Sequence, residues 1–202
     1  MKYMETYNLV NVTKKIYDSG FKLFTIKTLR DLLETRNEST FFSILKRLLK
    51  NEVLLKIERS KYVLKEAEIH DFAIANFVYS PSYISFETAL NYHGILSQFP
   101  YEILSGTSKK TTKKIINGKS FVYIHLKKDL IWGYEKKDGF LIALPEKAFL
   151  DQVYLAAKGL RTLNLDEYDF SLINSKKLKE YLENYPKIKQ FNKIVRLIDK
   201  YI

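Results

Sequence analysis

The sequence has 202 residues, of which 46% are hydrophobic, so it is long enough and apolar enough for two small packed domains or one medium domain. The lack of cysteine excludes disulfides, thiolate metal sites and cysteine nucleophiles. No apolar run approaches the roughly 20 residues of a membrane span, and the N-terminus has no apolar core of a secretion signal. We therefore expect a soluble cytoplasmic protein. Lysine and arginine outnumber aspartate and glutamate by 34 to 23, and the net charge of +11 favours an anionic partner, either nucleic acid or an anionic membrane surface.

Two short helical patterns open the chain. Residues 9–18 have the apolar periodicity of a helix, and this pattern stops at Gly20. Residues 27–34 form a second short helical pattern, with three leucines on its inward face.

A third helical pattern covers residues 39–50, and its two faces differ in chemistry. The apolar face consists of Phe41, Ile44, Leu45 and Leu48. The opposite face carries one hydroxyl and three cations, at Ser43, Lys46, Arg47 and Lys50. One side can therefore be buried in a small core while the other suits a helix that lies between phosphate backbones.

Residues 53–58 and 62–65 have the pattern of two strands around a cationic tip, Arg59-Ser60-Lys61. Three helices and a hairpin within about 65 residues are typical of a winged helix-turn-helix, whose last helix enters the major groove of DNA. We therefore predict a winged-helix domain over residues 1–66. The alternative interpretation is an ordinary amphipathic helix whose charged stripe faces solvent.

The winged-helix interpretation assigns DNA contacts to the start of the third helix, its polar face and the hairpin tip. The helix residues would reach base edges and phosphates, and the hairpin cations would contact the flanking backbone. The predicted DNA-binding residues are Asn37, Ser39, Thr40, Ser43, Lys46, Arg47, Lys50, Arg59 and Lys61.

The positive charge is unevenly distributed along the chain. Residues 1–66 carry 14 basic and 8 acidic side chains, whereas residues 67–106 contain four acids and no lysine or arginine. A second basic block then begins with Lys109, Lys110, Lys113 and Lys114. Because small turn-forming residues flank this block, it is either a second patch that contacts the nucleic-acid backbone or a mobile, solubilising loop.

Residues 67–202 have the pattern of a mixed second domain. Helices are expected over residues 69–78 and 86–93, the second with Ser85 as its N-cap. Strand-like segments follow at residues 103–105, 121–126, 130–134 and 140–144. A turn that contains Asp138-Gly139 joins the last two of them.

Helices are predicted to close the chain. Pro145 suits the first turn of a helix that runs to residue 157, and the tail contains two helices broken at Pro186. The predicted fold class is α+β, with an N-terminal winged helix-turn-helix domain followed by a mixed α/β C-terminal domain that has a small antiparallel sheet and a helical tail.

Two segments of the second domain resemble the AbiEi family. They are SPSYISFETALNYHG at residues 80–94 and ALPEKAFLD at residues 143–151. With the winged helix before them, the resemblance covers about residues 8–160. The wing retains Arg59 and Tyr62 of the family pattern but lacks a glycine between them, which leaves the type of hairpin turn open.

The resemblance implies an antitoxin of a type IV toxin–antitoxin, or abortive-infection, system. Such a protein represses its own operon by binding double-stranded operator DNA, expected to contain inverted repeats. It opposes a nucleotidyltransferase-like toxin without forming a stable complex with it. Residues 67–202 would then be the antitoxin domain, and no enzymatic activity or cofactor is expected.

Two other functions remain open. Glu146 and Asp151 could hold Mg²⁺ in a nucleic-acid enzyme. Glu146 is better explained as an anchor for the start of its helix, with Lys147 and Asp151 as an i, i+4 pair on an adjacent face. The winged helix could alternatively bind a protein, as an interaction adaptor. No metal site is expected, because none of the histidines has the spacing of a metal ligand: His70, His93 and His125.

Overall fold

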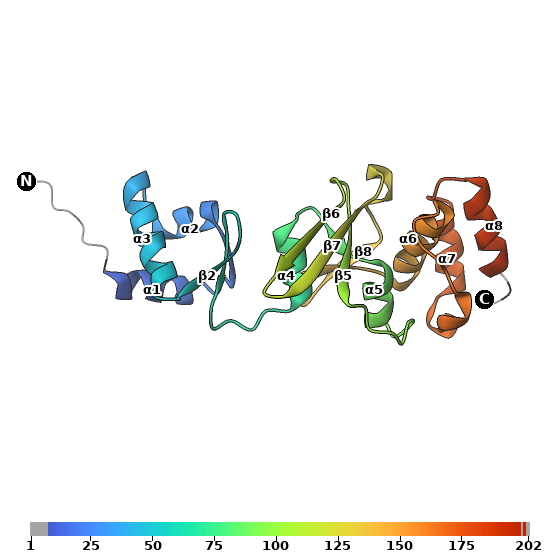
Figure 1. Ribbon diagram of the computed structural model, residues 1–202, viewed down its shortest axis with the longest axis horizontal. Coiled ribbons are helices and arrows are strands. Elements are labelled where there is room, and N and C mark those ends of the chain that lie inside the picture. Colours follow the sequence, from blue (N-terminus) through green and yellow to red (C-terminus); the bar gives the residue numbers. More distant parts are fainter. Residues whose placement is uncertain (1–7, 199, 201–202) are drawn as a thin grey trace, which may run out of the picture. The chain divides into compact units, whose positions relative to one another are not determined.

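The computed structural model describes residues 8–198 and residue 200 of the chain. It divides into two compact units, Met1–His70 and Asp71–Ile202, within a few residues of the boundary expected after residue 66 (Figure 1). The fold is mixed α+β, in agreement with the sequence prediction. None of the helices in the described part of the chain combines the length and the apolar character that a membrane crossing requires.

The first unit folds around one apolar core to which its helices and strands all contribute. Its elements in chain order are α1 (Leu9–Asp18), β1 (Leu23–Thr25), α2 (Ile26–Leu33), α3 (Glu38–Lys50), β2 (Leu54–Glu58) and β3 (Lys61–Leu64). The strands form an antiparallel sheet in the order β1-β3-β2. Strand β1 was not predicted, because three residues are too few to show an alternating pattern.

The prediction for the two faces of α3 is confirmed on its apolar side. Phe41, Ile44, Leu45 and Leu48 are all buried, with exposed fractions between 0% and 4%. They pack with residues of α1, α2 and the sheet, among them Ile16, Leu29 and Leu54. Burial of these side chains holds α3 in one orientation, so its opposite face is the one presented to solvent.

The second unit contains the larger sheet, most of whose strands come from the middle of the chain. Its strands are β4 (Tyr83–Ile84), β5 (Glu102–Thr107), β6 (Thr112–Ile116), β7 (Lys119–His125), β8 (Tyr134–Lys137) and β9 (Phe140–Ala143). They lie in the order β6-β7-β5-β4-β9-β8. This sheet is larger than predicted, because the short strand β4 and the lysine-rich strand β6 were not recognised from the sequence.

The prediction of an antiparallel sheet is confirmed at three of the neighbouring pairs, β6–β7, β5–β4 and β9–β8. The pairs β5–β7 and β4–β9 are parallel, so the sheet is mixed. Each parallel pair joins strands that are not consecutive in the chain. Such pairings are decided by tertiary packing and leave no signal in local alternation.

One local prediction in the sheet region was wrong, and one open alternative is answered in part. Of the lysine block, Lys113 and Lys114 lie on strand β6, whereas Lys109 and Lys110 lie in the connection between β5 and β6. Residues 130–134 are not a strand, since a 3₁₀ turn, η1 (Lys128–Leu130), buries Leu130 and strand β8 begins only at Tyr134. The turn at Asp138-Gly139 is confirmed, and both residues have the positive φ that a tight hairpin turn requires.

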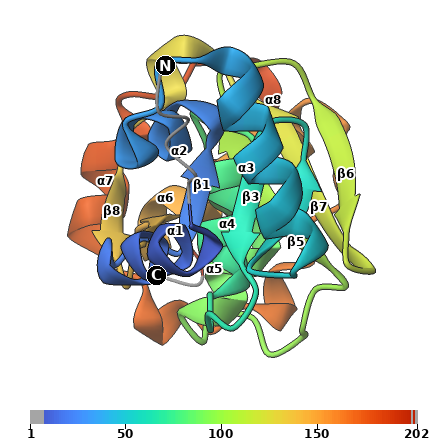
Figure 2. The ribbon, with the colours of Figure 1, turned by 90° about the vertical axis from the view of Figure 1, so that its left-hand side faces the viewer.

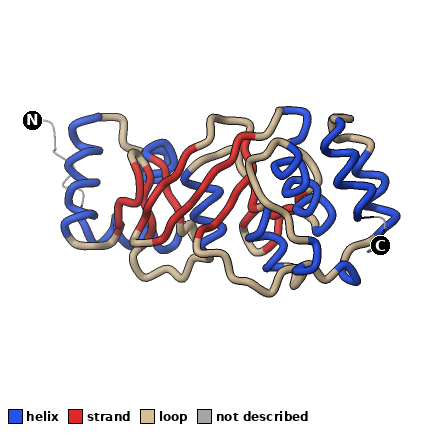
Figure 3. Tube along the Cα trace, turned by 45° about the vertical axis from the view of Figure 1, so that its right-hand side comes forward, coloured by secondary structure: helices blue, strands red, loops and turns tan. Residues whose placement is uncertain are grey.

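Helices flank the sheet and form the C-terminal part of the unit. They are α4 (Asp71–Val78), α5 (Phe86–Tyr92), α6 (Pro145–Ala157), α7 (Ser175–Leu182) and α8 (Lys189–Ile198), with two further 3₁₀ turns, η2 (Leu165–Glu167) and η3 (Phe170–Leu172). Helix α6 contacts α5, α7, α8 and strand β9. Figure 1 shows α7 and α8 beside it, and Figure 3 shows this group of helices near the end marked C. Its residues from Glu146 to Leu155 are all buried, so it is the central helix of this unit.

Candidate nucleic-acid interface

The exposed face of α3 carries the polar residues that the sequence pattern placed there. Ser43, Lys46, Arg47 and Lys50 are all exposed to solvent. Among the described residues, no ion pair involves Lys46 or Lys50. These two ammonium groups are therefore available to an external anion.

The start of α3 is built differently from the prediction. The Asn37 side chain is the N-cap: its Oδ1 accepts hydrogen bonds from the Thr40 amide at 3.1 Å and from the Ser39 hydroxyl at 2.7 Å. An N-cap of this kind satisfies amide groups that have no partner within the helix. The acceptor atom of Asn37 is thus engaged in stabilising α3, and Thr40 is only half-exposed, so both are less suited to reading base edges than predicted.

Helix α2 holds the N-terminal end of α3 in place through Arg30. The Arg30 guanidinium carbon lies 5.0 Å from the centre of the Phe41 ring, and its Nη2 lies 3.6 Å from a carboxylate oxygen of Glu38. Both partners belong to α3. This contact complements apolar packing and keeps the two helices in register.

The hairpin tip consists of Arg59 and Ser60, and Ser60 adopts a φ of +61°. A serine thus takes the left-handed conformation that glycine adopts most readily. The tip is anchored, because the Ser60 carbonyl accepts a hydrogen bond from the Ile26 amide at the start of α2 (3.2 Å). Arg59 is exposed, whereas Lys61 is half-buried within β3 opposite Thr25, so Lys61 does not belong to the tip.

The four lysines of the predicted second basic patch do not share one environment. The Lys113 ammonium lies 2.6 Å from the Glu102 carboxylate, and the Lys109 ammonium donates to the Ser80 carbonyl. The hydrogen bond from Lys113 lowers the pKa of Glu102 below its usual range, with a further contribution from Ser120. Part of the positive charge is therefore neutralised locally.

Lys113 and Lys114 lie on β6, which forms one edge of the six-stranded sheet (Figure 2). Charged side chains on an edge strand oppose its pairing with a strand of another molecule. This physical role accounts for two of the lysines without a nucleic-acid contact.

A buried polar cluster around α6 was missed by the sequence interpretation. Lys147 and Asp151 form an ion pair with both side chains 0% exposed, whereas an exposed pair had been considered. Lys147 Nζ also donates to the hydroxyl oxygens of Tyr83 (3.0 Å) and Tyr185 (2.9 Å). Asp151 accepts from both tyrosine hydroxyls and from Ser85, each at 2.8 Å. Ser85 occupies the predicted N-cap position of α5, but its side chain makes no cap hydrogen bond there because it bonds to Asp151.

The electrostatics of this cluster follow from its burial. Burial lowers the pKa of Lys147, and the attraction of Asp151 opposes that change. Burial and the Asp151 charge together raise the pKa values of Tyr83 and Tyr185 well above the usual value. The hydrogen-bonding capacity of the Asp151 carboxylate is used within the protein, which suits an architectural role better than metal binding.

Glu146, the other candidate acid, holds the start of α7. It is 3% exposed, its Oε1 accepts from the Asn174 amide at 3.0 Å, and Lys177 lies 3.2 Å from its Oε2. These partners support the anchor interpretation, although the anchored helix is α7 and not its own helix α6. The described residues contain no group of three or more acidic or histidine side chains arranged to hold a metal ion.

No protein-family profile matches the chain, and no curated protein sequence is significantly similar to it.

Proposed function

We propose that the first unit is a winged helix-turn-helix module that binds double-stranded DNA, with α3 in the major groove and the β2–β3 hairpin as the wing. The order of its elements and the sheet order β1-β3-β2 support this assignment. The observation that carries the proposal is α3 itself. It buries one apolar face completely and exposes Ser43, Lys46, Arg47 and Lys50 on the other.

The proposed contacts differ in what they contribute. Arg47, whose planar guanidinium can bond a guanine edge at two points, would supply sequence specificity. Lys46, Lys50 and Arg59 would contact phosphates, which strengthens binding without selecting a sequence. Ser39 and Ser43 would add hydroxyl contacts, while Asn37 and Thr40 act mainly through the helix start.

The test is a binding titration with DNA from upstream of the protein's own gene, in which fluorescence anisotropy of the labelled DNA measures binding. Arg47→Ala is expected to weaken binding by about 1–3 kcal/mol and to relax selectivity at one base pair. Arg196→Ala, an exposed arginine on α8 of the second unit, is the matched control and should bind as the unmodified chain does. Equal affinity of the Arg47→Ala variant and the unmodified chain would contradict the proposed role of α3.

Salt dependence separates DNA binding from the adaptor alternative. A protein that contacts several phosphates loses orders of magnitude in affinity when the salt concentration rises, because binding releases counterions from the DNA. If the same surface instead binds a protein, the affinity for that protein is expected to fall much less steeply as the salt concentration rises. A shallow slope with DNA would therefore favour the adaptor function.

The biological role we propose is that of a cytoplasmic repressor and antitoxin of the AbiEi type, on the basis of the motifs at residues 80–94 and 143–151. Co-expression with a nucleotidyltransferase-like toxin encoded beside it should restore growth. The Arg47→Ala variant should still restore growth while losing repression, because neutralisation is assigned to the second unit. Failure of the unmodified chain to restore growth would leave only the DNA-binding function.

A further inference from the structure

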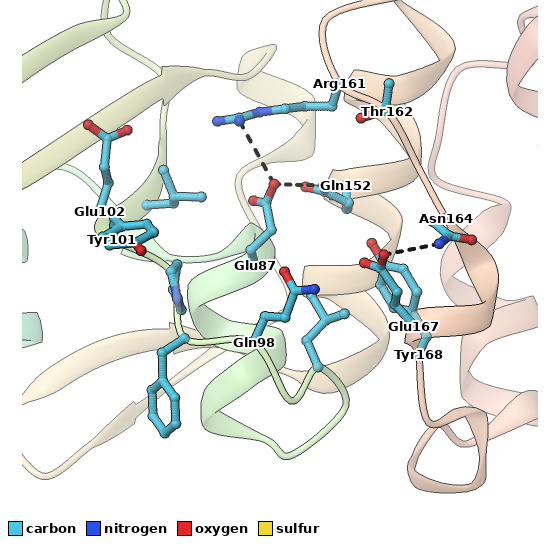
Figure 4. A pocket seen from close by; sticks show the side chains of 14 residues that line it. Glu87, Gln98, Tyr101, Glu102, Gln152, Arg161, Thr162, Asn164, Glu167 and Tyr168 are labelled. Carbon is cyan, nitrogen blue, oxygen red and sulfur yellow. Dashed lines mark hydrogen bonds and ion pairs between the residues drawn. The ribbon is translucent and has the colours of Figure 1, made fainter.

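The second unit contains a pocket of about 440 Å³ that neither the proposed DNA contacts nor the buried cluster of α6 uses (Figure 4). It lies among α5, α6, the start of β5 and the segment after α6. Its polar lining comes chiefly from Glu87, Gln152, Arg161, Glu167 and Tyr168. The polypeptide segments that meet here are distant in the sequence, so only the tertiary fold creates the pocket.

Two hydrogen-bond acceptors in the pocket have no donor among the residues that the structure describes. Gln152 is only 2% exposed, and its amide donates to Glu87 Oε1 at 2.9 Å, but its own oxygen Oε1 is buried without a hydrogen-bond partner from that part of the chain. Glu87 Oε2 is likewise buried and has no such partner there. Buried acceptors of this kind are normally satisfied, so the pocket is chemically incomplete as it stands.

The charge of the lining favours a cation. Three carboxylates, Glu87, Glu102 and Glu167, line the pocket against a single guanidinium, Arg161. Arg161 forms a long ion pair with Glu87 Oε1 at 3.9 Å, beyond hydrogen-bond distance, and Glu102 is paired with Lys113. Within the described residues, the Glu167 carboxylate accepts a hydrogen bond from the neutral amide of Asn164 and has no cationic partner. Negative charge therefore remains on the Glu87 and Glu167 side.

The hydroxyl of Tyr168 lies in the same environment. Burial raises the pKa of Tyr168, the negative charges of Glu87 and Glu167 raise it further, and a hydrogen bond with Gln152 opposes these changes. Tyr168 is therefore a neutral phenol in this pocket.

Aromatic side chains at the rim supply the remaining recognition element. Phe99 and Tyr101 line the pocket and are 86% and 103% exposed, respectively. In Figure 4, Tyr101 and Tyr168 lie on opposite sides of the pocket. Planar cations stack on such rings, and a guanidinium does so while presenting five N–H donors in one plane.

We propose that this pocket binds a guanidinium group, with Glu87 and Gln152 accepting its hydrogen bonds and Tyr101 covering its face. The ligand is either the arginine side chain of a polypeptide or a small free guanidinium compound. This site lies in the second unit and is independent of the proposed DNA contacts, so it adds a ligand-binding function to this unit.

The test is an NMR titration of the full-length, isotope-labelled chain with N-acetyl-arginine amide. We expect saturable shifts at the side-chain amide of Gln152, at the Arg161 guanidinium and at the backbone amides of residues 98–102. The neutral analogue N-acetyl-citrulline amide, which has the same shape but no charge, should produce no saturable shifts. Saturable binding of citrulline with equal affinity, or no saturable shift at these positions with arginine, would overturn the proposal.

Two variants test the assigned contacts. Glu87→Gln, which preserves the size of the side chain, should weaken binding by about tenfold, and Tyr101→Ala should weaken it by about threefold. Tyr101 is fully exposed, so its removal leaves the core intact and provides a readout even if Glu87→Gln fails to fold. Glu180→Gln, an exposed carboxylate on α7 outside the pocket, is the matched control and should bind normally. If the Tyr101→Ala variant and a folded Glu87→Gln variant both bind with the affinity of the unmodified chain, the site is excluded.

Comparison of ligands identifies the source of the guanidinium. Tighter binding of agmatine than of the blocked amino acid would identify a free small molecule. Tighter binding of a short peptide with a central arginine would identify a polypeptide ligand.

Discussion

Lysines on helices of the two units lie in opposite environments. Lys46 on α3 of the first unit is exposed and has no ion pair among the described residues. Lys147 on α6 of the second unit is 0% exposed and is bonded to Asp151, Tyr83 and Tyr185. An exposed lysine retains its charge for a partner, whereas a buried one must be compensated within the fold. The comparison shows that net positive charge identifies an anionic partner only where the cations remain unpaired at the surface.

The largest expected effect comes from removing the partner of the buried lysine. Asp151→Ala should destabilise the second unit by about 3–5 kcal/mol, because Lys147 would remain buried without an anion. The ring centre of the single tryptophan, Trp132, lies 5.1 Å from Lys147 Nζ, so its fluorescence reports on this unit. Urea unfolding monitored by this fluorescence measures the loss of stability.

The matched control is the exposed i, i+4 pair between Glu183 and Lys187, in which both side chains are 73% exposed. Glu183→Ala should cost less than about 1 kcal/mol, because an exposed pair gains little from its attraction. Similar losses of stability in the two variants would remove the contrast between the exposed and the buried lysine.

The next effect concerns the exposed cations of the first unit. The double change Lys46→Ala and Lys50→Ala should reduce the slope of log affinity against log salt concentration by about two, one for each phosphate contact. Lys176→Ala with Lys179→Ala on α7 removes the same charge from exposed positions of the second unit and should leave the slope unchanged. DNA-binding titrations at several salt concentrations measure both. A slope that depends only on the number of lysines removed would point to non-specific binding.

A smaller effect is expected at the start of α3. Asn37→Ala should destabilise the first unit by about 1 kcal/mol, because it removes the acceptor for the Thr40 amide. Amide hydrogen exchange at Thr40 should accelerate accordingly. Asn37→Asp, which keeps an acceptor at this position, should restore protection. If Asn37→Ala abolishes DNA binding without faster exchange, Asn37 contacts DNA directly.

The smallest effect is a pH dependence in the second unit. Burial lowers the pKa of His93 below its ordinary value of 6.5, and its Nε2 lies 2.8 Å from the Ala143 carbonyl. Between pH 6.5 and the lowered pKa, His93 is protonated more fully in the unfolded chain than in the folded one. The folded state is therefore destabilised as the pH falls from 6.5 through the lowered pKa. His93→Gln should flatten this part of the curve of unfolding free energy against pH. An identical curve for the variant would assign the acid sensitivity to other groups.

Features with a strong local signal were predictable from the sequence. The buried face of α3 was correct because apolar residues at helical spacing must be removed from water on one side. The limits of α6 followed from Pro145 at its first turn, and the turn between β8 and β9 followed from Asp138-Gly139. Each of these signals operates over a few residues, so it requires no knowledge of the remaining fold.

The sequence by itself therefore determined the mixed helix and strand content, the inward face of α3 and the excess of positive charge. Only the tertiary structure decided that Lys147 and Asp151 are buried, because their i, i+4 spacing is the same for an exposed pair and Tyr83 and Tyr185 come from distant segments. Parallel strand pairing and the Glu87–Gln152 pocket likewise depend on segments brought together by packing. The physical reason is that local periodicity determines which side of an element is apolar, whereas burial of a charge depends on what the rest of the chain places against it.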